Sequence, residues 1–278
     1  MNRAGRLVGQ VVWRFRYDLL AILVVATVMA IAVDYVGLQA VSGVVPLMGI
    51  VVAIFIGFRN RNAYNRWWEA RTLWSSVLVN ARSLNYALIS YEDGTPEMAA
   101  ITDRMRRREV RHAWRLAAEL RGTPAAVANL TPEDPAEATA TELLARQATD
   151  IGELSRAGLI DRQARRVLVT INSAQVAAAT GLERIRQQPI PRFYDLFTRG
   201  LAWFFAVIVC TRMDTGSHDN AIGIGLGVLI MTLVIFAERL GALLEKPMSD
   251  DIFGLPLDRF CGELTADLLG PSHVLARI

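Results

Sequence analysis

The sequence predicts an all-α membrane protein with four transmembrane helices and a cytosolic helical region. Three observations lead to this prediction. Hydrophobic residues make up 53% of the 278 residues, and the mean hydropathy of +0.29 is high for a soluble protein. Stretches with little or no charge occur in two pairs, one near the start of the chain and one in its last third. Between the pairs runs a long polar segment with helical periodicity and no strand-like alternation.

Four apolar stretches are the predicted membrane spans, identified by their length and their lack of charge. They cover residues 19–38, 38–58, 200–211 and 220–237. A helix that crosses the hydrocarbon core needs about 20 mostly apolar residues, so the third stretch qualifies only if residues 193–197 extend it or if neighbouring helices shield its ends. Because lipid offers no hydrogen bonds to the backbone, all four spans are predicted to be helices.

The distribution of arginine predicts how these spans are oriented. The N-terminal tail and the middle of the chain are rich in arginine, whereas the connector at residues 37–43 has neither lysine nor arginine. By the positive-inside tendency, the N-terminus, the middle and the C-terminus are cytoplasmic. The chain therefore divides into a tail with the first pair of spans, a cytosolic helical region, a second pair of spans and a cytosolic C-terminal tail: 1–60, 61–191, 192–244 and 245–278.

The polar middle of the chain is predicted to be helical, with one exposed loop. Residues 103–121 place apolar residues three and four apart, as an amphipathic helix does, and Gly122 with Pro124 ends this helix. The stretch that follows is rich in Ala, Thr, Pro and acidic residues, which is typical of an exposed loop. Helices are predicted to resume near Glu142 and again over 161–186.

The second span is predicted to continue as one long helix into the cytosol, because no proline or glycine interrupts the chain between Phe58 and Glu92. A stripe of bulky apolar residues, at i, i+4 and i+8, consists of Ile50, Ile54 and Phe58. A neighbouring stripe of small residues, which lets helices approach closely, consists of Gly49, Ala53 and Gly57. Periodicity leaves two interpretations of the bulky stripe: it faces lipid, or it faces the axis of an oligomer and forms a hydrophobic constriction.

Nothing in the sequence predicts a catalytic or metal site. The two cysteines, Cys210 and Cys261, lie far apart, and the three histidines are scattered. The chain has no phosphate-binding glycine loop, no zinc-protease motif and no nucleophile elbow. We therefore expect no enzymatic activity, no metal centre and no cofactor.

Three segments resemble the bestrophin family and its bacterial homologues. They are GFRNRNAYNRWWEARTLW at 57–74, PIPRFYD at 189–195 and EKPMSDDIFGLPLDRF at 245–260. The resemblance implies a homopentameric ion channel with a single central pore, whose narrow neck is lined by the bulky stripe on the second membrane helix. Apart from the resemblance, the centre of the first segment, with Arg66, Trp67 and Trp68, suits an interfacial motif at the membrane boundary or a packed junction.

The resemblance implies two further features of the cytosolic region. A second constriction is expected near the start of the helix around 161–186, with Ile160, Gln163 and Leu168 as candidates. The acidic run that binds calcium in animal members is reduced here to Asp250 and Asp251. Two carboxylates fall short of the six to eight oxygens that calcium prefers, so weak calcium binding or none is expected.

Ion selectivity is the least constrained property, because the neck residues carry no charge. Arg59 and Arg61 would favour anions if they faced the axis, whereas Glu69 or Glu183 would favour cations. The bacterial character of the segments favours monovalent cations such as sodium, conducted across the bacterial inner membrane. The alternatives are a chloride channel of the same architecture and a membrane-anchored helical scaffold without a pore. The expected partners are four further copies of the chain, monovalent ions and the lipid bilayer, and no nucleic acid.

Overall fold

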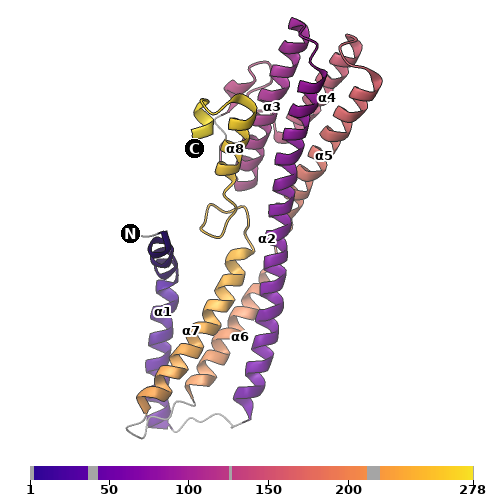
Figure 1. Cartoon of the computed structure of the whole chain (residues 1–278). Coiled ribbons are helices and arrows are strands. Elements are labelled where there is room, and N and C mark those ends of the chain that lie inside the picture. The colour runs from indigo at the N-terminus through magenta and orange to yellow at the C-terminus, as the bar shows by residue number, and fades with distance from the viewer. Residues whose placement is uncertain (1–2, 37–42, 125–126, 212–219, 278) are drawn as a thin grey trace. The chain divides into compact units, whose positions relative to one another are not determined.

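The computed structural model describes residues 3–36, 43–124, 127–211 and 220–277, and these residues form helices and connecting turns without any strand (Figure 1). The α-helices are α1 (Arg3–Val36), α2 (Val44–Tyr91), α3 (Pro96–Arg121), α4 (Ala140–Arg156), α5 (Arg162–Gln187), α6 (Arg192–Cys210), α7 (Asn220–Leu244) and α8 (Leu257–Leu269). Two short 3₁₀ helices are η1 (Ala128–Leu130) and η2 (Val274–Arg277). The predicted all-α class is confirmed.

The chain forms two compact units, which we call unit 1 and unit 2. Unit 1 consists of Met1–Asn65 and Ile190–Glu245, and unit 2 consists of Arg66–Pro189 and Lys246–Ile278. Helix α2 is continuous across the division, so its first part belongs to unit 1 and its second part to unit 2. The placement of one unit in the membrane and the other in the cytosol stays a prediction.

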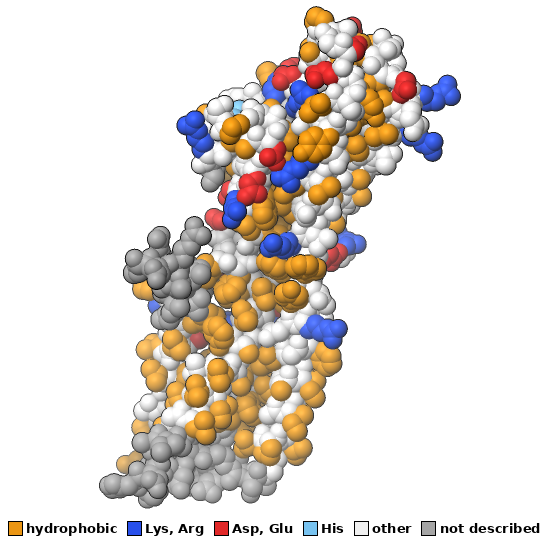
Figure 2. All heavy atoms as spheres, viewed as in Figure 1, with side chains coloured by type: hydrophobic (Ala, Val, Ile, Leu, Met, Phe, Trp, Pro, Cys, Tyr) orange, Lys and Arg blue, Asp and Glu red, His pale blue; other side chains and the backbone are white. Residues whose placement is uncertain are grey.

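Unit 1 contains α1, α6, α7 and the first part of α2, and its apolar residues lie both inside and outside. Two small clusters form its interior, one centred on Ile22 and Met231 and the other on Val52 and Phe205. On its outside, Figure 2 shows hydrophobic side chains over most of the visible face of these helices. An apolar exterior of this extent is typical of a surface that meets lipid or a second subunit.

Three described helices have stretches long and apolar enough to cross a membrane. These stretches lie in Val44–Tyr91, Phe193–Cys210 and Ile224–Leu244. They correspond to the second, third and fourth predicted spans, and the third span begins at Phe193, as its predicted extension required. Helix α1 is not among the three, so the count of four spans stays a prediction.

Unit 2 is a bundle of α3, α4, α5, α8 and the second part of α2, built around an apolar core that includes Trp74, Leu116 and Leu182. Its helices begin with strong N-caps: Thr95 accepts from the backbone of α3, Thr139 and Glu142 form a capping box on α4, and Asp161 caps α5. The predicted helices over 103–121, from Glu142 and over 161–186 are confirmed by α3, α4 and α5.

Helix α3 ends where its sequence predicts, at Gly122. This residue has φ of 73°, a left-handed conformation that suits glycine, and its N–H donates to the carbonyls of Ala118 and Glu119.

The connection between α3 and α4 is exposed at most of its described residues, as its composition predicts, but it is also fixed to α3 at buried positions. Thr131 and Asp134 are buried, because arginines of α3 bind the polar groups of the loop. Arg108 donates to both carboxylate oxygens of Asp134, at 2.7 and 3.0 Å, and Arg111 donates to the hydroxyl of Thr131 at 2.7 Å. Composition alone misses this packing, because the partners lie about 20 residues earlier on a helix face.

The C-terminal segment, predicted as a cytosolic tail over 245–278, belongs to unit 2 from Lys246 onward. The Trp114 Nε1–H of α3 donates to the hydroxyl of Thr265 on α8 at 3.1 Å, and Arg121 pairs with Asp258 at 2.7 Å. The turn before α8 depends on Gly254, where a Cβ atom would lie 1.8 Å from the carbonyl oxygen of Ser249. The segment therefore completes the core of unit 2.

Candidate functional site

The candidate site lies on the first part of α2, where one face of the helix is exposed and the opposite face is buried. Helix α2 runs unbroken for 48 residues, which confirms the prediction of one long helix. Its bulky stripe is exposed in the protomer: Ile50 is 59%, Ile54 50% and Phe58 59% exposed. The described residues of unit 1 leave this stripe exposed, so it is available to line a pore or to contact a second subunit or lipid.

The opposite face of α2 packs into unit 1 and fixes the rotation of the helix. Val52 and Ile56 are buried in one cluster with Ala202, Phe205 and Val209 of α6. Since residues 52 and 56 are one helical turn apart, they form a stripe on the face opposite the bulky stripe. Burial of this pair therefore determines which side chains the helix leaves outside.

One turn further along the same buried face, Arg59 forms a charged cluster inside unit 1. Its side chain is fully buried and donates to Glu238 at 2.5 Å, to Glu245 at 2.8 Å and to the hydroxyl of Thr198 at 2.8 Å. It also donates to Asp195. One guanidinium thus binds groups of α6, of α7 and of the residue after α7, and it ties α2 to both helices.

The carboxylates of this cluster have further basic neighbours. Arg199 and Arg239 lie 4.0 and 3.9 Å from Glu238, and Arg239 also pairs with Asp18 of α1 at 2.5 Å. Buried charges require such pairing, because an unpaired ion in a low-dielectric interior is strongly unfavourable. The cluster therefore links all four helices of unit 1 by charge.

The two arginines expected to act on selectivity have different surroundings. Arg59 is directed into unit 1 by its carboxylate partners, so it does not belong to the exposed stripe. Arg61 is exposed and follows Phe58 by three positions, which places it next to the end of the bulky stripe. Of the two, only Arg61 stands where its charge can act on an ion beside that stripe.

The stripe of small residues is divided between two environments. Gly49 lies against α6, where an added Cβ atom would lie 3.4 Å from Phe205. Ala53 and Gly57 are exposed, and a Cβ at Gly57 would meet nothing within 4 Å. Within the protomer, only Gly49 serves the close helix packing predicted for all three. The role of Ala53 and Gly57 in packing between subunits stays a prediction.

The Arg-Trp-Trp motif has structural contacts within unit 2. Arg66 donates to the carbonyl of Gln188 at 2.7 Å and to that of Ile185, so it binds carbonyls at the end of α5. The Trp67 Nε1–H donates to the carbonyl of Phe253 at 2.8 Å. Trp68 is about half exposed. The interfacial role predicted for the motif is untested, but two of its residues hold other segments in place.

The three candidates for a second constriction differ in how deeply their side chains are buried. Ile160 and Leu168 are buried in a cluster of unit 2 with Leu84 and Met105, whereas Gln163 is exposed on α5. A side chain that fills the protomer core cannot line a passage, so Gln163 is the one candidate of the three that remains available.

Of the acidic candidates, Glu69 and Asp250 have ion-pair partners, and Glu183 accepts from the Thr141 hydroxyl at 3.5 Å. Glu69 pairs with Arg184 at 2.5 Å, and Asp250 lies 3.8 Å from Arg121 while its side chain is 88% exposed. Among the described residues, no group of three or more His, Cys, Asp or Glu side chains is arranged to hold a metal ion. The expectation of little or no calcium binding at Asp250 and Asp251 stays a prediction.

A second buried polar cluster, in unit 2, was not predicted from the sequence. Glu109 accepts from Gln175 at 3.1 Å and from Gln147 at 3.3 Å, and Gln175 Nε2 lies 3.4 Å from His112 Nδ1. Burial raises the pKa of Glu109 to about 7, although Arg108 acts against this, and burial lowers the pKa of His112 to about 4. The spacing of Glu109 and His112, three apart on one face of α3, was the available signal.

These features define a class of protein. It is a helical membrane protein in which the long helix α2 exposes an apolar stripe on one face and is held on the opposite face by the buried ion pairs of Arg59. Comparisons with known proteins identify the family. The family profile described as "Bacterial/Fungal Bestrophin protein" matches residues 2–269, and the chain therefore belongs to the bestrophin family.

Relatives and solved structures agree with this assignment. The chain is 29% identical over 238 residues to "Voltage-dependent anion channel-forming protein YneE" of Escherichia coli K12, covering 80% of this chain and 74% of that protein. It is also 29% identical over 227 residues to "Voltage-dependent anion channel-forming protein mll4386" of Mesorhizobium japonicum, covering 77% and 70%. A crystal structure of a bacterial Bestrophin homolog from Klebsiella pneumoniae matches with a TM-score of 0.83 at 24% identity, covering 92% of this chain and 97% of that chain, and shows the same fold.

The comparisons do not support the expected preference for cations. Both relatives above are named for anions, so the alternative that was stated beside it, a chloride channel of the same architecture, fits better.

Proposed function

We propose that the chain is the subunit of a homopentameric channel for small monovalent anions such as chloride. In this proposal Ile50, Ile54 and Phe58 of five subunits form a hydrophobic neck around one central pore. The channel lies in the bacterial inner membrane with four spans per subunit and with both termini cytoplasmic. It acts without a cofactor, a bound metal or an enzymatic step.

A single observation carries the proposal: the bulky stripe is exposed while the opposite face of the same helix is packed and anchored by charge. Lipid contact alone would explain exposed apolar residues, but it does not require a rigid orientation. Arg59 with its three carboxylates holds the rotation of α2 within a few residues of the stripe. A fixed orientation is what a narrow apolar constriction needs if its width is to be reproducible.

The charge beside the stripe supports anions over cations. The neck residues are uncharged, so they do not select by sign. Arg61 is exposed next to the end of the stripe, and five copies would place five positive charges near the neck. Arg59, whose charge is balanced by buried carboxylates, adds little to this field.

The test is ion flux through the purified protein in liposomes, with the mass of the same sample measured by light scattering. The proposal predicts a pentamer whose reversal potential follows the chloride gradient, and it predicts that Arg61→Gln reduces the preference for chloride. Arg71→Gln, an exposed arginine further along α2, is the matched control. A reversal potential that follows sodium would contradict the anion assignment but keep the channel. A monomer or an oligomer smaller than a pentamer, without ion flux, would support the alternative of a membrane-anchored helical scaffold without a pore.

A further inference from the structure

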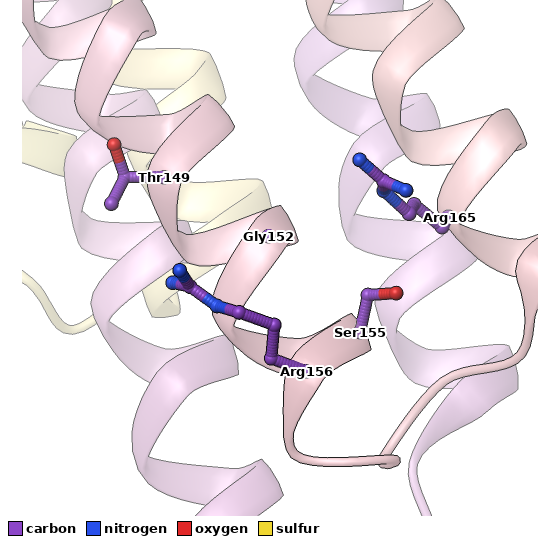
Figure 3. A pocket seen from close by; sticks show the side chains of 5 residues that line it. All are labelled: Thr149, Gly152, Ser155, Arg156 and Arg165. Atoms are coloured by element: carbon purple, nitrogen blue, oxygen red, sulfur yellow. The ribbon is translucent and has the colours of Figure 1, made fainter.

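A groove of about 380 Å³ lies between α4 and α5 of unit 2, outside the site described above (Figure 3). Four of the residues that line it come from α4 and one from α5: Thr149, Gly152, Ser155, Arg156 and Arg165. In Figure 3 the Arg165 guanidinium points from α5 toward α4, the Ser155 hydroxyl points toward α5, and the Arg156 side chain extends on the other side of Gly152. Two cationic groups and a hydroxyl therefore line the groove, with Gly152 between the two arginines.

The carboxylates nearest in sequence are bound elsewhere. Glu153 pairs with Arg104 at 2.8 Å, and Asp150 is held by Arg104 and Arg108. Asp161 accepts from the backbone N–H of Ala164 at 2.6 Å as the cap of α5. None of these acids lines the groove.

The two arginines of the groove thus lack a counter-ion from the protein. Within the described residues, neither Arg156 nor Arg165 has an ion pair or a side-chain hydrogen bond. Two further arginines, Arg162 and Arg166, are exposed in the first turns of α5 and add to the positive potential. Like charges that share one groove repel each other unless an anion binds between them.

Gly152 keeps the centre of the groove open. It lies inside helix α4, where glycine is a poor helix former, and its φ is not in the left-handed range that would require glycine. A Cβ atom at this position would meet nothing within 4 Å, so packing does not explain the glycine either. Because Gly152 has no side chain, the space between the two arginines stays open.

We propose that this groove binds a phosphate-type oxyanion, either free phosphate or the phosphate of a monoester. Guanidinium groups match the geometry of such anions because they can donate two parallel hydrogen bonds to neighbouring oxygens. Arg165 donates from α5 and Arg156 from α4, and the Ser155 hydroxyl donates a further hydrogen bond. The bound anion bridges the two helices and neutralises their repulsion. This site does not depend on the channel function proposed above.

The experiment measures thermal unfolding of the full-length protein in detergent, titrated with inorganic phosphate at constant ionic strength against chloride. Binding raises the unfolding midpoint with phosphate concentration. The variant Arg165→Gln weakens the apparent affinity by about tenfold or more, because it removes a charge-assisted pair of hydrogen bonds. Arg162→Gln, which makes the same charge change in the same helix outside the groove, removes no contact with the anion and weakens the affinity by less than about twofold.

Two further variants make the result decisive. Gly152→Leu fills the space between the two arginines and abolishes the rise of the unfolding midpoint with phosphate. Gly152→Ala leaves more room and reduces this rise less. A titration with a nucleoside monophosphate distinguishes the two sources: tighter binding than inorganic phosphate indicates a monoester, and equal binding indicates the free ion. The proposal is overturned if phosphate gives no more stabilisation than chloride, or if Arg162→Gln weakens the effect as much as Arg165→Gln does.

Discussion

Unit 1 and unit 2 differ in which residues they expose and which they bury. Unit 1 exposes apolar side chains, Ile54 among them, and holds the fully buried Arg59 among carboxylates. Unit 2 has a large apolar core and exposes most of its charged residues, as a water-soluble bundle does. The difference is what the proposed placement of unit 1 in the membrane requires, because lipid can cover apolar side chains but cannot hydrate a charge.

The largest effect is expected for the charged anchor of unit 1. Arg59→Met leaves Glu238 buried without its main partner, which costs about 3–5 kcal/mol for a broken buried ion pair. Thermal unfolding in detergent measures the loss. The double variant with Glu238→Met recovers part of it, since no buried charge is then left alone at that contact. Arg61→Met changes an exposed arginine two positions away and is the control; equal losses in the two single variants would contradict the anchor.

The buried polar cluster of unit 2 predicts two opposing pH effects. The pKa of Glu109 is about 7 in the folded state, above its ordinary 4.5, so its contribution to stability is complete below pH 4.5 and is lost as the pH rises to 7. The pKa of His112 is about 4 when folded, below its ordinary 6.5, so stability is lost as the pH falls from 6.5 to 4. Each change corresponds to about 3 kcal/mol, and the two largely cancel.

Single variants separate these two pH effects. Relative to the parent protein, Glu109→Gln becomes less stable as the pH falls from 6.5 to 4, because only His112 remains. His112→Asn becomes more stable, relative to the parent, as the pH falls from 7 to 4.5. Unfolding by denaturant at a series of pH values measures both slopes. Parallel pH profiles for the two variants and the parent would show that neither group has the pKa that its burial implies.

A pair of glycines gives the smallest predicted effects and compares the packing of the two units. In unit 1 a Cβ atom at Gly241 would lie 2.1 Å from the Asn60 side-chain oxygen, so Gly241→Ala is expected to cost about 1–3 kcal/mol. In unit 2 a Cβ atom at Gly152 meets no neighbour, so Gly152→Ala is expected to stabilise by up to about 1 kcal/mol through helix propensity. Unfolding midpoints that move in the same direction would contradict this comparison.

Most of the fold could be predicted from local signals in the sequence. Periodicity and the glycine at 122 locate the helices of unit 2. The absence of Pro and Gly predicts the continuation of α2. These signals suffice because each acts within a few residues along the chain.

The parts that could not be predicted depend on partners far apart in the sequence. Arg59 stands in a run of polar residues, and nothing local shows that Glu238, 179 positions later, holds it inside unit 1. The same is true of Asp134, which composition places in an exposed loop although Arg108 buries it. Periodicity selected the bulky stripe on α2, but it cannot distinguish lipid from a pore axis, because both accept an exposed apolar side chain.

The most direct test compares single-channel currents of Ile54→Ala and Ile56→Ala, two alanine substitutions on opposite faces of α2. Ile54 is exposed and Ile56 is buried, so the account predicts that Ile54→Ala raises conductance or open probability while the unfolding midpoint changes little. Ile56→Ala instead is expected to lose about 2–5 kcal/mol of stability without widening the pore. Currents of Ile54→Ala identical to those of the parent channel would contradict the central claim that this face of α2 lines the pore.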